Sequence, residues 1–279
     1  MFKTRAAAAS HITCTIVSLI AAVTLTTFAQ ADADEANSQQ AFSDDQLPNN
    51  FPILNSSGTA ATFSTTGFVE LNNTFHTPQG TNGRSCGSCH LVQAGWSIRP
   101  IDVEFKFFFT QGTDPIFNLL DANSPNADVS TPRARFASYS MLRKGLFRRG
   151  GNVPANAEYE IITVDDPLGA GGSLTKFQAF RRPLATANFH IAKNIGWHDQ
   201  DTDGIATVHD GLTHQAAGNI TGAQQGSPAS PETIEAIVSF EQELRFAQQS
   251  VFGVGSLTSC GASGGPENLS EQSAIAGRF

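Results

Sequence analysis

The five residues Cys86-Gly87-Ser88-Cys89-His90 constrain this chain more than any other feature of its sequence. On one helical turn, residues three positions apart face the same side, so both thiols can reach one flat ligand. The imidazole that follows can then bind a metal at the centre of that ligand. This C-x-x-C-H spacing is the attachment sequence of c-type haem. We therefore expect one covalently bound haem c, linked to Cys86 and Cys89, with His90 as the proximal iron ligand.

A disulfide or a zinc site is the alternative explanation of the C-x-x-C pair. Because Cys and His are rare, a chance match to the whole motif has a probability on the order of one in a thousand. The chain has no second C-x-x-C and no H-x-x-x-H that would complete a zinc site. These counts favour haem. The remaining cysteine of the mature chain, Cys260, has no assigned role.

The amino terminus has the pattern of an export signal. Lys3 and Arg5 precede an uncharged apolar run from about residue 6 to residue 28, which ends at Ala29-Gln30-Ala31. We expect a signal peptide over residues 1–31, cleaved near Ala31, and hence a periplasmic protein. An uncleaved anchor is the alternative, but the Thr, Ser and Ala content of the run favours cleavage. No later stretch is apolar enough to span a membrane.

Net charge bears on the partners. The chain carries -8 at neutral pH, and removal of residues 1–31 takes away the two cations Lys3 and Arg5 and no acid, which leaves -10. This acidity argues against nucleic acid as a partner. We expect a redox partner protein instead.

The predicted fold is mainly α-helical, a cytochrome c-like haem domain with a small inserted β element. Residues 32–64 are polar and turn-rich and predict a flexible arm, and residues 253–279 predict a Gly/Ser-rich tail. The haem domain is expected over 65–252, with an insertion at about 97–180. Within it, the hydrophobic spacing predicts helices at about 66–75, 132–147 and 231–249, and strands at 101–109 and 159–164.

The sixth iron ligand decides between an electron carrier and peroxide chemistry. Met141 is the only thioether of the mature chain, and it either binds the iron or fills the core. His190, His198 and an open position are the other candidates. Arg84, beside the motif, is either a partner of the haem propionates or a solvated surface charge.

Four segments resemble, in order, the amino-terminal haem domain of the bacterial dihaem cytochrome c peroxidase family. They are Gly83-Arg84-Ser85-Cys86-Gly87-Ser88-Cys89-His90, Arg182-Pro183-Leu184-Ala185-Thr186-Ala187-Asn188, Trp197, and Leu212-Thr213-His214-Gln215-Ala216-Ala217-Gly218. The resemblance implies that Asn188 binds calcium, that Trp197 lies between two haems, and that Gln215 lies near a peroxide site.

The chain also departs from that family. Residues 91–189 contain no His, Gln225 stands where the family has an acid, and Cys260 does not begin a second C-x-x-C-H. We therefore expect a single-haem, divergent or truncated relative. Electron transfer is the expected function. The alternative is peroxide reduction by an enzyme that takes electrons from a second haem or a partner donor, and a third possibility is a haem-bearing remnant whose role is structural or lost.

Overall fold

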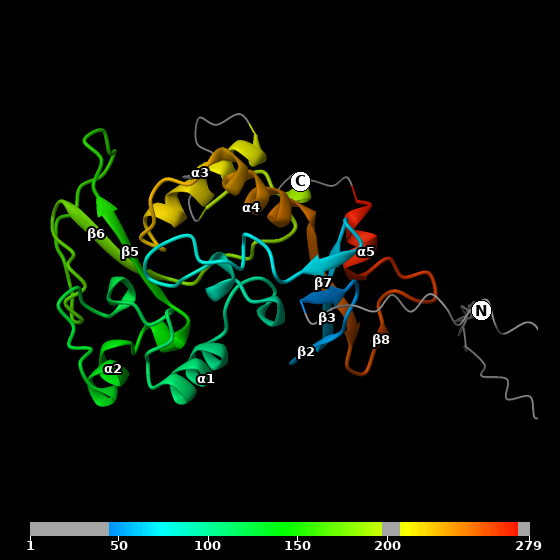
Figure 1. The fold of residues 1–279 in the computed structure, drawn as a ribbon, viewed down its shortest axis with the longest axis horizontal. Helices are drawn as coiled ribbons and strands as arrows, with labels where there is room; N and C mark the ends of the chain where they lie inside the picture. Colours follow the sequence, from blue (N-terminus) through cyan, green and yellow to red (C-terminus); the bar gives the residue numbers. More distant parts are fainter. Residues whose placement is uncertain (1–44, 197–206, 273–279) are drawn as a thin grey trace, which may run out of the picture. The chain divides into compact units, whose positions relative to one another are not determined.

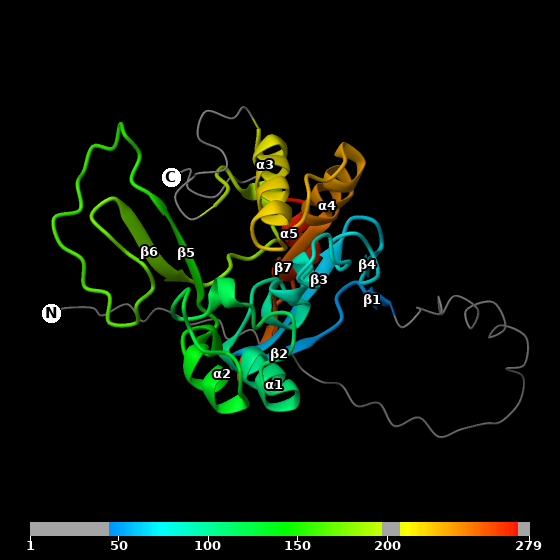
Figure 2. The ribbon, with the colours of Figure 1, turned by 60° about the vertical axis from the view of Figure 1, so that its left-hand side comes forward.

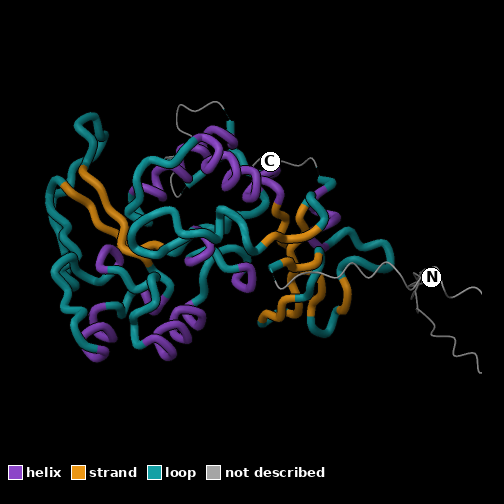
Figure 3. The backbone as a smooth tube through the Cα atoms, in the orientation of Figure 1, coloured by secondary structure: helices purple, strands orange, loops and turns teal. Residues whose placement is uncertain are grey.

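The computed structural model describes residues 45–196 and 207–272. Contacts divide the chain between Ala41 and Phe42, and every element below belongs to the second unit. The described residues form five α-helices and eight β-strands (Figures 1 and 3). The prediction of a mainly α-helical fold is therefore wrong, because helices and sheets are mixed. The predicted signal peptide, Trp197 and His198 lie outside the described residues.

The largest sheet joins the two ends of the described chain. It contains β2 (Ile53–Asn55), β3 (Gly58–Ser64), β7 (Leu244–Val251) and β8 (Gly255–Ser256), in the order β2-β3-β7-β8 and antiparallel throughout. Figure 1 shows β3 beside β7. A second ribbon pairs β1 (Gln46–Pro48) with β4 (Phe68–Glu70).

Within the described residues, these strands correct the predicted arm at 46–64, the start of the predicted tail at 255–256 and the helix expected at 66–75. The polar composition of residues 46–64 suggests a flexible arm, but their polar side chains instead pair across strands. For example, the hydroxyl groups of Thr59 and Ser250 are 2.7 Å apart. In the predicted tail, α5 (Gly265–Ser270) contacts β7 and β3.

Residues 101–109, predicted as a strand, are part of helix α1 (Pro100–Thr110). Pro100 occupies the first helical turn, where it needs no backbone N–H, and the Asp102 carboxylate accepts a hydrogen bond from the backbone N–H of Arg99 at 3.0 Å. Val103 and Phe107, four residues apart, are the buried apolar side chains of the helix. Phe residues lie on both faces of α1, and their spacing therefore produced the apolar–polar alternation that is typical of a strand.

The helix predicted at 132–147 is interrupted. Helix α2 (Pro132–Ser138) ends before Met141, whose backbone N–H donates to the Asn123 side chain at 3.1 Å and is thus lost to the helix. A short 3-10 turn, η4 (Leu142–Lys144), follows. The strand predicted at 159–164 is absent, and the hairpin of this region is instead formed by β5 (Phe147–Asn152) and β6 (Lys176–Arg181) (Figure 2).

Helices α3 (Val208–Thr221) and α4 (Pro231–Glu243) lie side by side (Figures 1 and 2). The predicted start of α4 is confirmed, since the Ser230 side chain accepts from the backbone N–H of Thr233 and Pro231 follows it. Its predicted end at about residue 249 is wrong. The chain passes directly into β7, because Leu244 and Phe246 fit the two-residue period of a strand and β3 supplies the hydrogen-bonding partner.

Two hydrophobic cores flank the C-x-x-C-H motif. The first surrounds α3, α4 and Trp96, and the second surrounds α1, Tyr139 and Leu142. Cys86 packs against the first core, and Cys89 packs against the second. The motif is therefore held from both sides. No helix of the described residues is long and apolar enough to cross a membrane.

Candidate functional site

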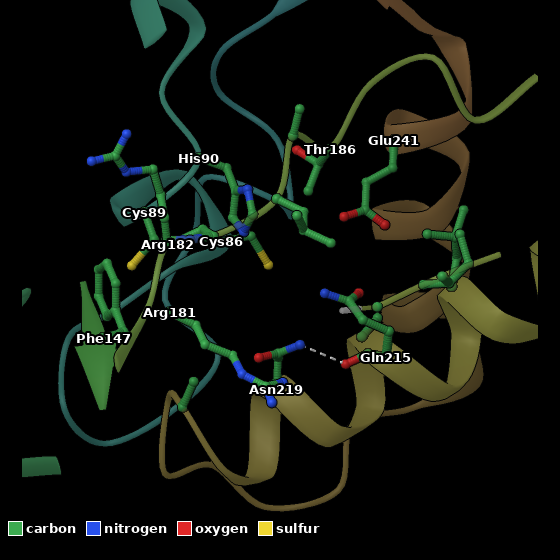
Figure 4. A pocket seen from close by; sticks show the side chains of 18 of the residues that line it. Cys86, Cys89, His90, Phe147, Arg181, Arg182, Thr186, Gln215, Asn219 and Glu241 are labelled. Carbon is green, nitrogen blue, oxygen red and sulfur yellow. Dashed lines mark hydrogen bonds between the residues drawn. The ribbon is translucent and has the colours of Figure 1, made fainter. Parts of the chain in front are cut away.

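The motif opens onto a cavity of about 580 Å³. This volume is within the range of about 300–1,000 Å³ that is common for small-molecule and cofactor sites. Figure 4 shows the sulfur atoms of Cys86 and Cys89 and the ring of His90 on one wall. The remaining walls come from the β5–β6 hairpin, residues 183–196, α3 and α4, and they carry the side chains of Phe147, Phe177, Arg181, Arg182, Leu184, Thr186, Phe189, Ile195, Leu212, Gln215, Asn219 and Glu241.

The imidazole of His90 is held by one of its two nitrogens. Its Nδ1 lies 2.9 Å from the backbone oxygen of Trp96. A carbonyl can only accept, so Nδ1 carries the proton and the Nε2 lone pair of the neutral ring is left for a metal. Burial lowers the pKa of His90, which favours this neutral form, although hydrogen bonding to the carbonyls of Trp96 and Leu184 opposes the shift.

Trp96 is anchored in turn. Its side chain is fully buried, and its indole N–H donates to the Thr62 hydroxyl on β3 at 3.0 Å. The oxygen that binds His90 also accepts from the backbone N–H of Thr186 at 3.1 Å. The ring of His90 is thus oriented by a chain of contacts that reaches the main sheet. No local sequence pattern predicts this arrangement.

The turn itself is a 3-10 helix, η1 (Cys86–Ser88), closed by Ser88. The Ser88 hydroxyl accepts from the backbone N–H of Ser85 at 3.0 Å, and the backbone N–H of His90 donates to the oxygen of Cys86 at 3.1 Å. At Gly87, an added Cβ would lie 2.5 Å from Cδ2 of His76, so no larger residue fits without movement of that ring. A close ring packed behind the turn explains the Gly of this motif.

Neither Cys86 nor Cys89 is in a disulfide, and both are partly buried. Burial raises the pKa of both thiols, to about 11 for Cys89, so they are neutral at pH 7. Within 45–196 and 207–272, no group of three His, Cys, Asp or Glu side chains could hold a metal ion. The donor set present is two thiols and one imidazole on a largely apolar cavity, which fits covalent attachment of haem c.

No family model, curated protein or solved structure matches this chain. The resemblance to dihaem peroxidases therefore stays a prediction.

Arg84 is committed to the protein rather than to a ligand. Its guanidinium donates to Asp121 at 2.6 Å and to the backbone oxygens of Pro115 and Ile116 at 2.9 and 2.5 Å. Arg149 also pairs with Asp121. Arg84 borders the cavity, but these bonds assign it to positioning the residues before Cys86.

The other predicted site residues fall into two groups. Gln215 lines the cavity. Met141 and His190 are not among the lining residues, and Nε2 of His190 is 2.9 Å from the oxygen of Leu269. The amide of Asn188 makes two hydrogen bonds with the backbone of Phe246, each 2.8 to 2.9 Å long, so it fastens residues 183–196 to β7 instead of facing a cation site.

Two polar residues of the cavity wall, Glu241 and Thr186, were not predicted from the sequence. Glu241 is 2 % exposed, and its Oε2 has no hydrogen-bond partner among the described residues; the same is true of the Thr186 hydroxyl. A signal for Glu241 existed, because it lies seven residues after Ile234 and three after Val238, on the buried stripe of α4. An acid on an apolar stripe needs an explanation that a surface acid does not.

Proposed function

We propose that this protein is a c-type cytochrome that binds one haem through Cys86 and Cys89 and takes part in electron transfer. The observation that carries the proposal is the shared wall on which both sulfurs and the oriented ring of His90 face one cavity. When bound, haem supplies an iron centre that gains and loses one electron. The signal-like residues 1–31 support export to the periplasm, the compartment in which we expect the protein and its redox partner.

The chain contributes three things to such a group. Cys86 and Cys89 fix its position, His90 provides a neutral nitrogen to the iron, and the apolar side chains exclude water from it. Arg181 at the cavity wall has the charge to pair with a porphyrin carboxylate, whereas the Arg182 guanidinium donates to the backbone oxygen of Lys144 at 3.1 Å. Water exclusion matters because it limits the reorganisation that accompanies a change of charge.

The test is the mass and the visible spectrum of the mature protein, secreted by a host that matures c-type cytochromes. We expect one covalent haem, which survives denaturation. The Cys86→Ala and Cys89→Ala double variant should lose the covalent link, and Cys260→Ala, at an exposed cysteine outside the cavity, is the matched control that should keep it. A colourless wild-type protein with both thiols unmodified contradicts the proposal.

Peroxide reduction is a second candidate, favoured by the polar side chains of Gln215 and Glu241 in the cavity wall. Such groups can hydrogen-bond a small oxygen ligand. Among the described lining residues, His90 is the one His and there is no Met. A ferric spectrum that shifts on addition of cyanide, together with rapid peroxide turnover by a reduced donor, would favour this candidate over a carrier.

A further inference from the structure

Glu241 is the feature of the cavity that attachment of haem leaves unexplained. Its carboxyl group points into the cavity from α4, while the side chain of Gln215 enters from α3 (Figure 4). One carboxyl oxygen lacks a hydrogen-bond partner within the described residues, although the side chain is 2 % exposed. A buried carboxylate without compensation is costly, so such a group responds strongly to any new charge nearby.

We propose that Glu241 takes up a proton when the protein accepts an electron, and thereby couples the two. This inference rests on the proposed function, since it requires haem in the cavity that Glu241 lines. The balance is simple. An external donor would supply one electron to the bound haem, and the Glu241 carboxylate would take one proton from solvent to become the acid, so the net charge of the cavity would be unchanged.

The surroundings of Glu241 allow this coupling. Burial alone raises the pKa of Glu241 to about 8, so the acid and the carboxylate are both accessible near neutral pH. The Cys86 thiol remains neutral over that range and would become a thioether in the haem protein. The other charged or titratable groups of the cavity wall, of the end of α4 and of the start of β7 are Cys89, His90, Arg84, Arg149, Arg181, Arg182, Glu243 and Arg245.

An added electron raises the pKa of a nearby carboxyl, because the extra negative charge disfavours the carboxylate, and a dry cavity strengthens the effect. The reduction potential should then fall with rising pH, between the pKa of Glu241 in the oxidised protein and its pKa in the reduced protein. For one proton per electron the limit is a tenfold change in the electron-binding constant per pH unit, or about 59 mV.

The experiment is a potentiometric titration of the haem protein from pH 5 to pH 10. In the wild type the reduction potential should fall with rising pH. In Glu241→Gln this fall should be smaller, while the haem spectrum is retained. Glu235→Gln is the matched control, because Glu235 lies on the same helix but is 55 % exposed and bonds to His209 outside the cavity. An equal slope in wild type and Glu241→Gln overturns the inference, since titration of the propionates is common to both.

A second measurement does not depend on the variant folding. The infrared difference spectrum between reduced and oxidised wild type should contain a band of a newly protonated carboxylic acid in water-free surroundings, and reduction in unbuffered solution should consume protons. Absence of both signals overturns the coupling but leaves the cytochrome proposal intact. Absence of covalent haem overturns the proposed function, and the coupling with it.

Discussion

Asp121 is the residue whose loss should most damage the approach to the motif. It is completely buried and pairs with two arginines, Arg84, which is 2 % exposed, and Arg149. In Asp121→Asn the buried guanidinium of Arg84 keeps its bonds to the oxygens of Pro115 and Ile116 but loses its counter-charge. Removal of one partner of a buried ion pair costs about 3–5 kcal/mol.

The expected loss of stability in Asp121→Asn lies near the lower end of this range, because the hydrogen bonds from Arg84 to backbone oxygens remain. Arg149 is 43 % exposed, so the Arg149–Asp121 pair contributes at most about 1 kcal/mol. We therefore expect a loss of about 3 kcal/mol in the free energy of unfolding. For a chain of this size that is roughly 6–12 °C in Tm.

The assay is urea denaturation at pH 7 with haem content measured in parallel. The control is Glu104→Gln, which breaks the pair of Glu104 with Arg143, where the carboxylate is 42 % exposed, and should cost no more than about 1 kcal/mol. Equal losses in the two variants would refute the assignment of Arg84 and Asp121 as a buried support of the motif.

Three further predictions concern single residues. Because the pKa of Glu241 is about 8 in the folded chain against 4.5 in a free side chain, its contribution to stability is full below pH 4.5 and is lost as the pH rises to 8. At 1.36 kcal/mol per pKa unit the loss is about 5 kcal/mol, so Glu241→Gln should be the more stable protein in denaturation at pH 9. Gly87→Ala should reduce stability by about 1–3 kcal/mol and lower haem content, because the new methyl group meets His76, whereas Gly218→Ala, which meets nothing within 4 Å, should not. Asn188→Ala should cost about 1–3 kcal/mol whether or not calcium is present, and a calcium-dependent Tm that this variant abolishes would restore the cation role.

The sequence predicted one local feature correctly, the start of α4, and predicted several others wrongly, such as the helix at 66–75 and the strand at 101–109. The C-x-x-C-H motif faces a cavity as a unit, and the cap at Ser230 starts α4 where its sequence indicates. The cap is encoded within a few neighbouring residues, whereas the orientation of the His90 ring also depends on Trp96 and Thr62.

Features decided by distant contacts were not predictable in the same way. Residues 100–110 carry Phe on both faces, so helix and strand periods fit equally, and the choice depends on Pro100 and on packing. Helix α4 ends before Leu244 because strand β3 provides backbone hydrogen-bonding partners for the residues of β7. The partner of His90 is a backbone oxygen of Trp96, which has no side-chain signature at all.

The sulfur atoms of Cys86 and Cys89 face inward, and their protonated form dominates once the chain has folded. Thiolate, not thiol, is the reactive species, so the finished protein would bond a porphyrin slowly. In the proposed cytochrome, thioether formation would therefore come before closure of the walls by α3, α4 and the hairpin. The cavity walls would then fold around the attached haem, rather than the haem entering a cavity that has already folded.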